Sequence, residues 1–238
     1  MAQNEAIKRM STVKRLLKPD FDRNCMDMAL YLLGKVLVRK LDTGDVLKGR
    51  IVETECYLGN EDKASKSYNG RRTPANEPMY MPPGTCYVYQ TYGMYHCFNV
   101  SSQEPGSAVL LRALEPIIGM DIMRDFRKAK KGKVIEKSHV ICNGPAKLCI
   151  SMDINKANCN KLDLGDPEND ILWIEDDFQM ENSEIQVVKT SRIGIDSAGE
   201  EWARKPLRFY IAGNTSVSKL DKRAEKQLES HITSPYFP

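Results

Sequence analysis

The sequence of 238 residues contains no long apolar run. The segment VLLRAL at residues 109–114 is among the longest, and it is far shorter than the roughly 20 residues that a membrane-spanning helix needs. The N-terminus also lacks the apolar central segment of a signal peptide. We therefore expect a soluble protein with no membrane partner.

Cysteine pairs in a CxxC spacing are missing as well. Seven cysteines is an odd number, which favours reduced thiols inside a cell over a disulfide framework. Cys142 and Cys149 follow His139 closely, but this spacing fits no common zinc site. The sequence therefore predicts no bound metal.

Internal repeats and long flexible linkers are absent too, which favours a single domain. Strand-like segments come in neighbouring runs with helices interspersed irregularly, a pattern typical of an α+β domain with a mainly antiparallel sheet. We expect a basic N-terminal arm at 1–15, the domain at 16–225 and a C-terminal tail at 226–238. The expected strands are 35–41, 49–58, 85–91, 94–102, 107–116 and 207–213, and the expected helices are 24–33, 117–131 and 144–154.

Charge is distributed unevenly along the chain, although the net charge is only +3. Residues 124–137 hold seven Lys and Arg against two acids. Such a segment either attracts a polyanion such as nucleic acid or forms a solvated face. Residues 162–184 hold nine acids and no basic residue, and we interpret them as a solvated face or loop.

Four tyrosines gather around one reversal of the chain in YVYQTYGMYHCFNV, residues 87–100. Strand alternation places Tyr87 and Tyr89 on one face. Gly93 supplies the positive φ that a tight turn needs, which leaves Tyr92 at the tip, where it cannot join a core. Flat, half-polar rings suit nucleic acid, whose bases can stack on them and whose duplex offers a gap to fill.

Two carboxylates share a strand face with a tyrosine in RIVETECYLGNED. Glu53, Glu55 and Tyr57 alternate along this strand, which places the carboxylates roughly 6.6–7 Å apart. Carboxylates in an apolar strand need partners, and Arg112 in VLLRAL is a candidate for a structural salt bridge with one of them. The alternative is a general base beside an aromatic platform, because an ionised Glu can accept a proton from water.

Several separate segments together resemble one known family. RIVETECYLG, RRTP, PPGTCYVYQTYGMYHCFNVSS, VLLRALEP, GPAKLC and GEEWARKPLRFY are similar to alkyladenine (3-methyladenine) DNA glycosylases of the non-helix-hairpin-helix type. The resemblance implies one α+β domain with a curved, mainly antiparallel sheet and a protruding hairpin. It also implies a monofunctional enzyme that flips alkylated or deaminated purines out of DNA and hydrolyses the N-glycosidic bond, without metal or cofactor.

The same resemblance assigns roles to residues of the site. Glu55 would activate the attacking water, and Arg112 and the backbone carbonyl of Ile193 would help to hold it. Tyr57 and Tyr89 would sandwich the flipped base.

Further residues are assigned to specificity and to DNA contact. Tyr92 would fill the gap that the base leaves, and Asn99 would exclude the N2 amine of guanine. Met94 and Leu110 match residues near this inserted tyrosine and near the pocket. Arg71, Thr73 and Met79 match phosphate-side and minor-groove contacts. Glu53 and Lys147 match structural positions.

One position departs from the family pattern. Where the family usually has a pocket histidine, the segment KASKS supplies Lys66. An ammonium can donate to an acceptor on a base, but it repels a cationic alkylpurine. We hypothesise that neutral lesions such as hypoxanthine and ethenoadenine are favoured relative to cationic ones. The alternative is that Lys66 turns outward to a phosphate.

We expect a glycosylase that acts on double-stranded DNA as a monomer. Two other functions compete with this interpretation. One is a non-catalytic lesion-binding protein. The other is a metal-dependent nucleic-acid hydrolase, but the chain has no HxE with PCxxC, and Glu53 and Glu55 lack the aspartates usual around magnesium. The expected compartment is the nucleus in a eukaryote and otherwise the cytoplasm.

Overall fold

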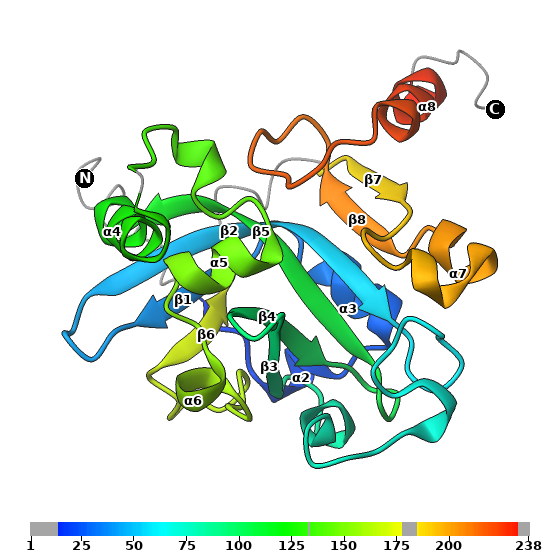
Figure 1. Cartoon of the computed structure of the whole chain (residues 1–238), viewed down its shortest axis with the longest axis horizontal. Helices are drawn as coiled ribbons and strands as arrows, with labels where there is room; N and C mark the ends of the chain where they lie inside the picture. Colours follow the sequence, from blue (N-terminus) through cyan, green and yellow to red (C-terminus); the bar gives the residue numbers. More distant parts are fainter. Residues whose placement is uncertain (1–13, 133, 178–184, 233–238) are drawn as a thin grey trace, which may run out of the picture.

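An open antiparallel sheet of eight strands organises the chain (Figure 1). The computed structural model describes residues 14–132, 134–177 and 185–232. Six strands follow in the order β3-β4-β5-β2-β1-β6, and β8 pairs with both β2 and β7. The strands are β1 Val36–Lys40, β2 Val46–Tyr57, β3 Cys86–Thr91, β4 Tyr95–Ser101, β5 Ala108–Ile118, β6 Leu172–Glu175, β7 Val187–Thr190 and β8 Arg208–Ile211.

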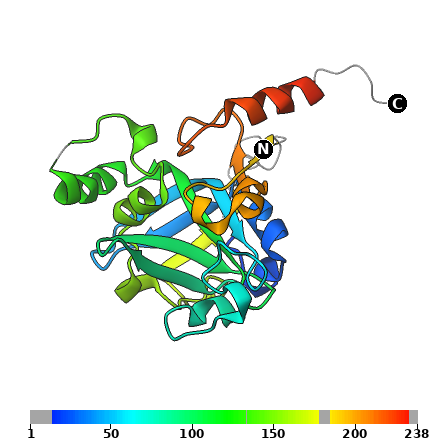
Figure 2. The same ribbon diagram turned by 45° about the vertical axis from the view of Figure 1, so that its right-hand side comes forward.

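Short helices cover both faces of the sheet. In Figure 1, α5 lies in front of the sheet and α3 lies behind it. Helix α8 extends away from the sheet at the β7 end (Figure 2). The helices are α2 Lys18–Phe21, α3 Cys25–Tyr31, α4 Met120–Lys131, α5 Pro145–Ser151, α6 Lys156–Cys159, α7 Glu200–Arg204 and α8 Lys222–Ile232, with short 3₁₀ turns at Tyr68–Gly70, Glu77–Tyr80, Ser138–Val140 and Asp196–Ala198. The predicted α+β fold with a mainly antiparallel sheet is confirmed.

Strand β2 presents two chemically different faces. Thr54 Oγ1 donates to the carbonyl of Ala29, and Cys56 Sγ donates to the carbonyl of Cys25, so these side chains point toward α3. Successive side chains of a strand point to opposite faces. Glu55 and its alternate neighbours therefore face away from α3, toward the side on which α5 lies.

Two irregularities set which residues share that face. The pairing of β2 with β5 shifts register between Ile51 and Glu53 and again between Glu53 and Thr54. Such β-bulges bend a strand and increase its twist. After them the pairing is regular through Tyr57.

Local sequence signals account for the elements next to the site. The side chain of Asn24 accepts from the backbone N–H of Asp27, as an N-cap residue does. The β1–β2 connection closes with Leu41 N–H donating to the carbonyl of Asp45. The predicted helix start is confirmed, and the chain reverses between the two predicted strands 35–41 and 49–58.

Two features of the structure lie at the expected domain limits, which remain a prediction. Arg15, at the end of the expected arm, donates to the carbonyls of Asp166 and Asn169, at 2.7 Å each. The expected boundary between residues 225 and 226 falls inside α8. Residues 1–13 and 233–238 lie outside the described residues.

The interpretation of residues 162–184 as a solvated segment is wrong for residues 172–176. Residues 172–175 form β6, and the Glu175 and Asp176 side chains are mostly buried. Lys48 pairs with Glu175 and Lys35 pairs with Asp176, at 2.5 Å each. Charge alone did not reveal these basic partners, because they belong to strands and loops more than 120 positions away. Residues 178–184 lie outside the described part of the chain.

Candidate active site

One row of residues crosses four strands of the sheet. Glu55 on β2 pairs with Leu110 on β5, Leu110 pairs with Asn99 on β4, and Asn99 pairs with Tyr87 on β3. Paired residues of neighbouring strands have side chains on the same face. The sheet thus brings together side chains that are 55 positions apart in the chain, counted from Glu55 to Leu110.

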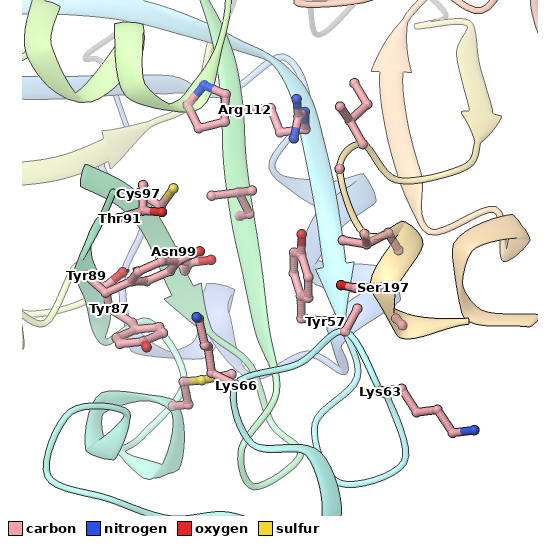
Figure 3. A pocket seen from close by; sticks show the side chains of 18 of the residues that line it. Tyr57, Lys63, Lys66, Tyr87, Tyr89, Thr91, Cys97, Asn99, Arg112 and Ser197 are labelled. Atoms are coloured by element: carbon pink, nitrogen blue, oxygen red, sulfur yellow. Dashed lines mark hydrogen bonds between the residues drawn. The ribbon is translucent and has the colours of Figure 1, made fainter. Parts of the chain in front are cut away.

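A cavity of about 360 Å³ opens above this row (Figure 3). The ring of Tyr57 forms one side, and the rings of Tyr87 and Tyr89 form the other. The latter two rings are tilted by 32°, with their centroids 5.2 Å apart. A slot between aromatic faces is suited to a flat, apolar or half-polar ligand. Its lining also includes Lys66, Met79, Cys97, Asn99, Leu110, Arg112, Pro145 and Ile193.

The carboxylate of Glu55 lies beneath this slot and is fully buried. Its Oε1 accepts from the backbone N–H of Ile193 at 2.8 Å and pairs with Arg112 Nη1 at 3.2 Å. Its Oε2 accepts from the Tyr57 hydroxyl at 3.0 Å. Two oxygens offer about four acceptor positions. Three are used by partners among the described residues, which leaves one position on Oε2.

Tyr57 links that carboxylate to the slot. Burial, and next the charge of Glu55, hold the pKa of the Tyr57 hydroxyl well above its ordinary value. The phenol therefore stays protonated and keeps donating to Glu55. One side chain thus orients the carboxylate and forms one wall of the slot.

Glu53 is buried as well, but its partners occupy it more fully. Its carboxylate accepts from Arg208 Nη1 at 2.7 Å, from Arg112 Nε at 3.2 Å, and from both the backbone N–H and the hydroxyl of Ser218. The predicted salt bridge with Arg112 is confirmed for Glu53, and Arg112 also contacts Glu55. We call Glu53, Glu55, Arg112 and Arg208 the charge cluster, and its formal charges cancel.

A second buried ion pair lies behind Tyr57. Arg192 donates two hydrogen bonds to the Asp62 carboxylate, and it also donates to the carbonyl of Cys56 at 2.8 Å. Its guanidinium lies 4.7 Å from the centroid of the Tyr57 ring. Arg192 also precedes Ile193, so this ion pair fixes both the ring and the loop that donates to Glu55.

Lys66 reaches into the slot from the loop between β2 and β3. Its Nζ lies 5.3 Å from the centroid of the Tyr89 ring, a cation–π contact. Figure 3 shows its ammonium pointing between Tyr57 and Tyr89, whereas neighbouring Lys63 points away from them. The alternative conformation, in which Lys66 turns outward to a phosphate, is not the one in this structure.

The apex of the β3–β4 hairpin is fully accessible. Tyr92 is 89% exposed and Met94 is 52% exposed. Gly93 has the expected positive φ, and Tyr92 itself has a φ of 51°, which is uncommon for a residue with a side chain. A large aromatic ring is thus held out in solvent on a tight turn, as the sequence predicts.

The remaining predicted contacts lie on the β2–β3 connection and on the sheet. Arg71 is exposed, and the backbone N–H and hydroxyl of Thr73 donate to Asn76. Met79 is 2% exposed and packs against Tyr87, so it supports the slot wall from within instead of standing on the surface as a DNA contact. Leu110 is likewise buried, in the pocket floor.

Some site residues were not assigned a role from the sequence. Tyr87 forms a wall of the slot, and its alternation with Tyr89 was the signal for it. Arg192 and Asp62 had no such signal, because 130 residues separate them and each stands in a polar segment.

Two structural observations bear on the other classes of function. Within residues 14–132, 134–177 and 185–232, no group of three or more His, Cys, Asp or Glu side chains is arranged to hold a metal ion. No helix in the same ranges is both long and apolar enough to cross a membrane.

Residues 19–215 match the sequence model of the methylpurine-DNA glycosylase family. The chain belongs to this family. It is 48% identical over 213 residues to the DNA-3-methyladenine glycosylase of Homo sapiens, covering 88% of this chain and 70% of that protein. A probable DNA-3-methyladenine glycosylase of Encephalitozoon cuniculi is 49% identical over 199 residues, with 84% and 90% covered. A putative 3-methyladenine DNA glycosylase of Clostridium botulinum is 43% identical over 205 residues, with 84% and 96% covered.

Membership confirms the family resemblance drawn from the separate motifs. The chain is a DNA glycosylase, a hydrolase of N-glycosyl bonds that acts in DNA repair, and the family supports a monofunctional enzyme. DNA is therefore its partner. The described slot lies within the matched residues 19–215.

Proposed function

We propose that the enzyme flips an alkylated or deaminated purine out of double-stranded DNA into the slot. A water activated by Glu55 then hydrolyses the N-glycosidic bond and leaves an abasic site. The observation that carries the proposal is the contact of one buried carboxylate with three groups that line the slot: the Tyr57 hydroxyl, the Arg112 guanidinium and the Ile193 backbone.

In this proposal the water occupies the space bounded by these three groups once the entering base has opened access to the buried Glu55 carboxylate. There the free position on Oε2 accepts the proton of the water as its oxygen attacks C1′ of the sugar. General base catalysis of this kind contributes about 10²–10⁴ in rate. The carboxylate charge also stabilises the positive charge that develops on the sugar.

The two walls of the slot hold the flipped base. Stacking returns roughly 1–3 kcal/mol per base, against an unstacking cost of a few kcal/mol. The base lies between Tyr57 and Tyr89, and Tyr92 fills the gap that it leaves in the duplex. The Asn99 amide donates to the carbonyl of Tyr87, which fixes the side chain where it would exclude the N2 amine of guanine.

The exposed surface around the slot contacts the DNA. Met94 flanks the wedge at the hairpin apex. Arg71 and Thr73, on the β2–β3 connection, contact the phosphate side of the bound strand. The enzyme works as a monomer without metal or cofactor, in the nucleus if its source is a eukaryote and otherwise in the cytoplasm.

The test uses duplexes that contain hypoxanthine, 1,N6-ethenoadenine or 7-methylguanine, with free base and strand scission measured separately. We expect free base without scission. Glu55→Gln should lower the single-turnover rate by about 10²–10⁴ while lesion binding persists. Glu115→Gln is the matched control, because Glu115 on β5 contacts Arg50 and Asn214 and does not line the slot.

The same assay separates the two competing functions. Binding without release of any base by the wild type would indicate a lesion-binding protein. Loss of activity in EDTA would indicate a metal-dependent hydrolase. Full excision by Glu55→Gln would remove Glu55 from the mechanism.

A further inference from the structure

Two lysines without a described acidic partner, Lys63 and Lys66, line the slot, but only the ammonium of Lys66 points between its two walls. None of the described residues that line it is acidic, and no described acid forms an ion pair with Lys66. The charge cluster below is formally neutral, because two arginines face two glutamates. The ammonium of Lys66 is therefore the positive charge that a base meets between the two walls.

That ammonium also occupies the place where a base would stack. It lies over the face of the Tyr89 ring and points between the two walls (Figure 3). An entering base must displace it from the ring. A neutral purine offers ring nitrogens or a carbonyl oxygen as new acceptors for the ammonium. A cationic alkylpurine offers fewer acceptors and repels the charge.

The two classes of lesion also differ in how they leave the sugar. A cationic alkylpurine departs as a neutral base when the N-glycosidic electron pair moves onto it. A neutral purine departs as an anion unless it gains a proton. A general acid beside the base is therefore useful to the second class alone.

We propose that Lys66 is the general acid for neutral lesions and the residue that selects them over cationic ones. This inference rests on the proposed function. As the bond from C1′ to the base breaks, the base takes the electron pair and the ammonium gives it a proton. Water forms the new bond to C1′ and gives its proton to Glu55. Solvent then returns a proton from Glu55 to Lys66, which restores the enzyme.

Single-turnover rates for hypoxanthine, 1,N6-ethenoadenine and 7-methylguanine test the proposal, each variant being compared with wild type lesion by lesion. Lys66→Met keeps most of the side-chain length and removes the charge and the proton. We expect it to slow excision of the two neutral bases about 10²-fold, while the rate for 7-methylguanine stays equal or rises. The same duplexes without enzyme supply the background of spontaneous base loss.

Two further variants sharpen the assignment. Lys66→Arg keeps the charge but cannot give up a proton, so it should lose hypoxanthine excision as Lys66→Met does and still disfavour 7-methylguanine. Lys63→Met removes a neighbouring positive charge that points away from the slot, so it should leave the ratio between lesion classes unchanged. Thermal unfolding shows whether each variant is folded.

The outcomes are distinct from those that test the proposed function. Equal losses for all three bases in folded Lys66→Met, or no loss at all, would overturn the role of Lys66 while excision itself stands. Wild-type hypoxanthine excision by Lys66→Arg would rule out the proton transfer. If the wild-type enzyme releases none of the three bases, the proposed function fails first.

Discussion

The charge cluster in the pocket floor and the apex of the β3–β4 hairpin belong to one sheet, yet they are held in opposite ways. In the floor, every charged side chain is buried and contacts partners from other strands or loops. At the apex, Tyr92 is almost fully exposed and depends on the backbone of a two-residue turn. In the proposed mechanism, base hydrolysis requires fixed groups that are shielded from solvent. Opening of the duplex requires an exposed aromatic ring that can contact the DNA.

A difference of the same kind separates the two glutamates of the floor. Glu53 accepts four hydrogen bonds, from two arginines and from Ser218. Glu55 accepts two hydrogen bonds and forms one ion pair, and all three partners line the slot. Identical side chains two positions apart thus differ in their partners, since one carboxylate is saturated and the other retains an acceptor position, which is why we propose a catalytic role for Glu55 alone.

The largest effect on stability should come from Glu53→Gln. The change leaves the buried Arg208 guanidinium without its carboxylate and leaves Arg112 with Glu55 alone, and breaking a buried pair costs about 3–5 kcal/mol. Urea unfolding should show a loss near the upper end of that range. Glu115→Gln, whose carboxylate is 38% exposed, should lose less than about 1 kcal/mol. Equal losses in the two variants would contradict the view of Glu53 as the structural member of the pair.

Asp62→Asn should have the next largest effect. It should lower both the free energy of unfolding and the rate of base excision. It weakens one buried ion pair, so we expect a loss at or below the lower end of the range of about 3–5 kcal/mol. Arg192 then holds the Tyr57 ring and the Ile193 loop less firmly, and excision should slow while lesion binding weakens little. Asp170→Asn, in an exposed pair with Lys40, should change neither quantity. A destabilised but fully active Asp62→Asn would limit this pair to folding.

Tyr92→Ala should affect only the step that opens the duplex. Filling the gap offsets an unstacking cost of a few kcal/mol, so excision from a fully paired duplex should fall about 10–100-fold. On a single-stranded substrate the rate should change little, because no gap needs filling. Tyr92→Phe retains the ring and should behave as wild type on both substrates. A similar loss on both would place Tyr92 in the pocket chemistry instead.

The smallest expected effect compares two variants that both lack the ring. Tyr92→Gly should be more stable than Tyr92→Ala by up to about 1 kcal/mol, because the positive φ strains any residue with a Cβ. Chemical unfolding of the two proteins measures the difference. If Tyr92→Ala is the more stable, the turn relaxes once the tyrosine is gone.

Strand alternation and turn residues predicted those parts of the site that depend on the local sequence. Alternation placed Glu53, Glu55 and Tyr57 on one face, and Gly93 marked the turn below Tyr92. Packing between distant segments was not predictable in this way. The pair of Arg192 with Asp62 joins loops 130 positions apart, and neither segment differs in composition from an ordinary surface loop.

The acidic segment at residues 162–184 shows the same limit of prediction from local sequence. Nine acids with no basic residue are typical of a solvated segment. Residues 172–175 instead form β6, where Lys48 pairs with Glu175, and Lys35 pairs with the adjacent Asp176. Whether a charge is buried depends on its partner, and one segment does not contain that information.

The β-bulges of β2 have a consequence for how this enzyme can change over evolutionary time. They fix the count of residues between the irregular part of the strand and the carboxylate, and a shift by one residue would turn the following side chains to the opposite face. Deletion of Val52 would therefore turn the Glu55 side chain toward α3. The slot would still admit a base, but the proposed catalytic carboxylate would no longer face it. A change in the number of residues here would therefore reorient Glu55, which a substitution that keeps the length would not do.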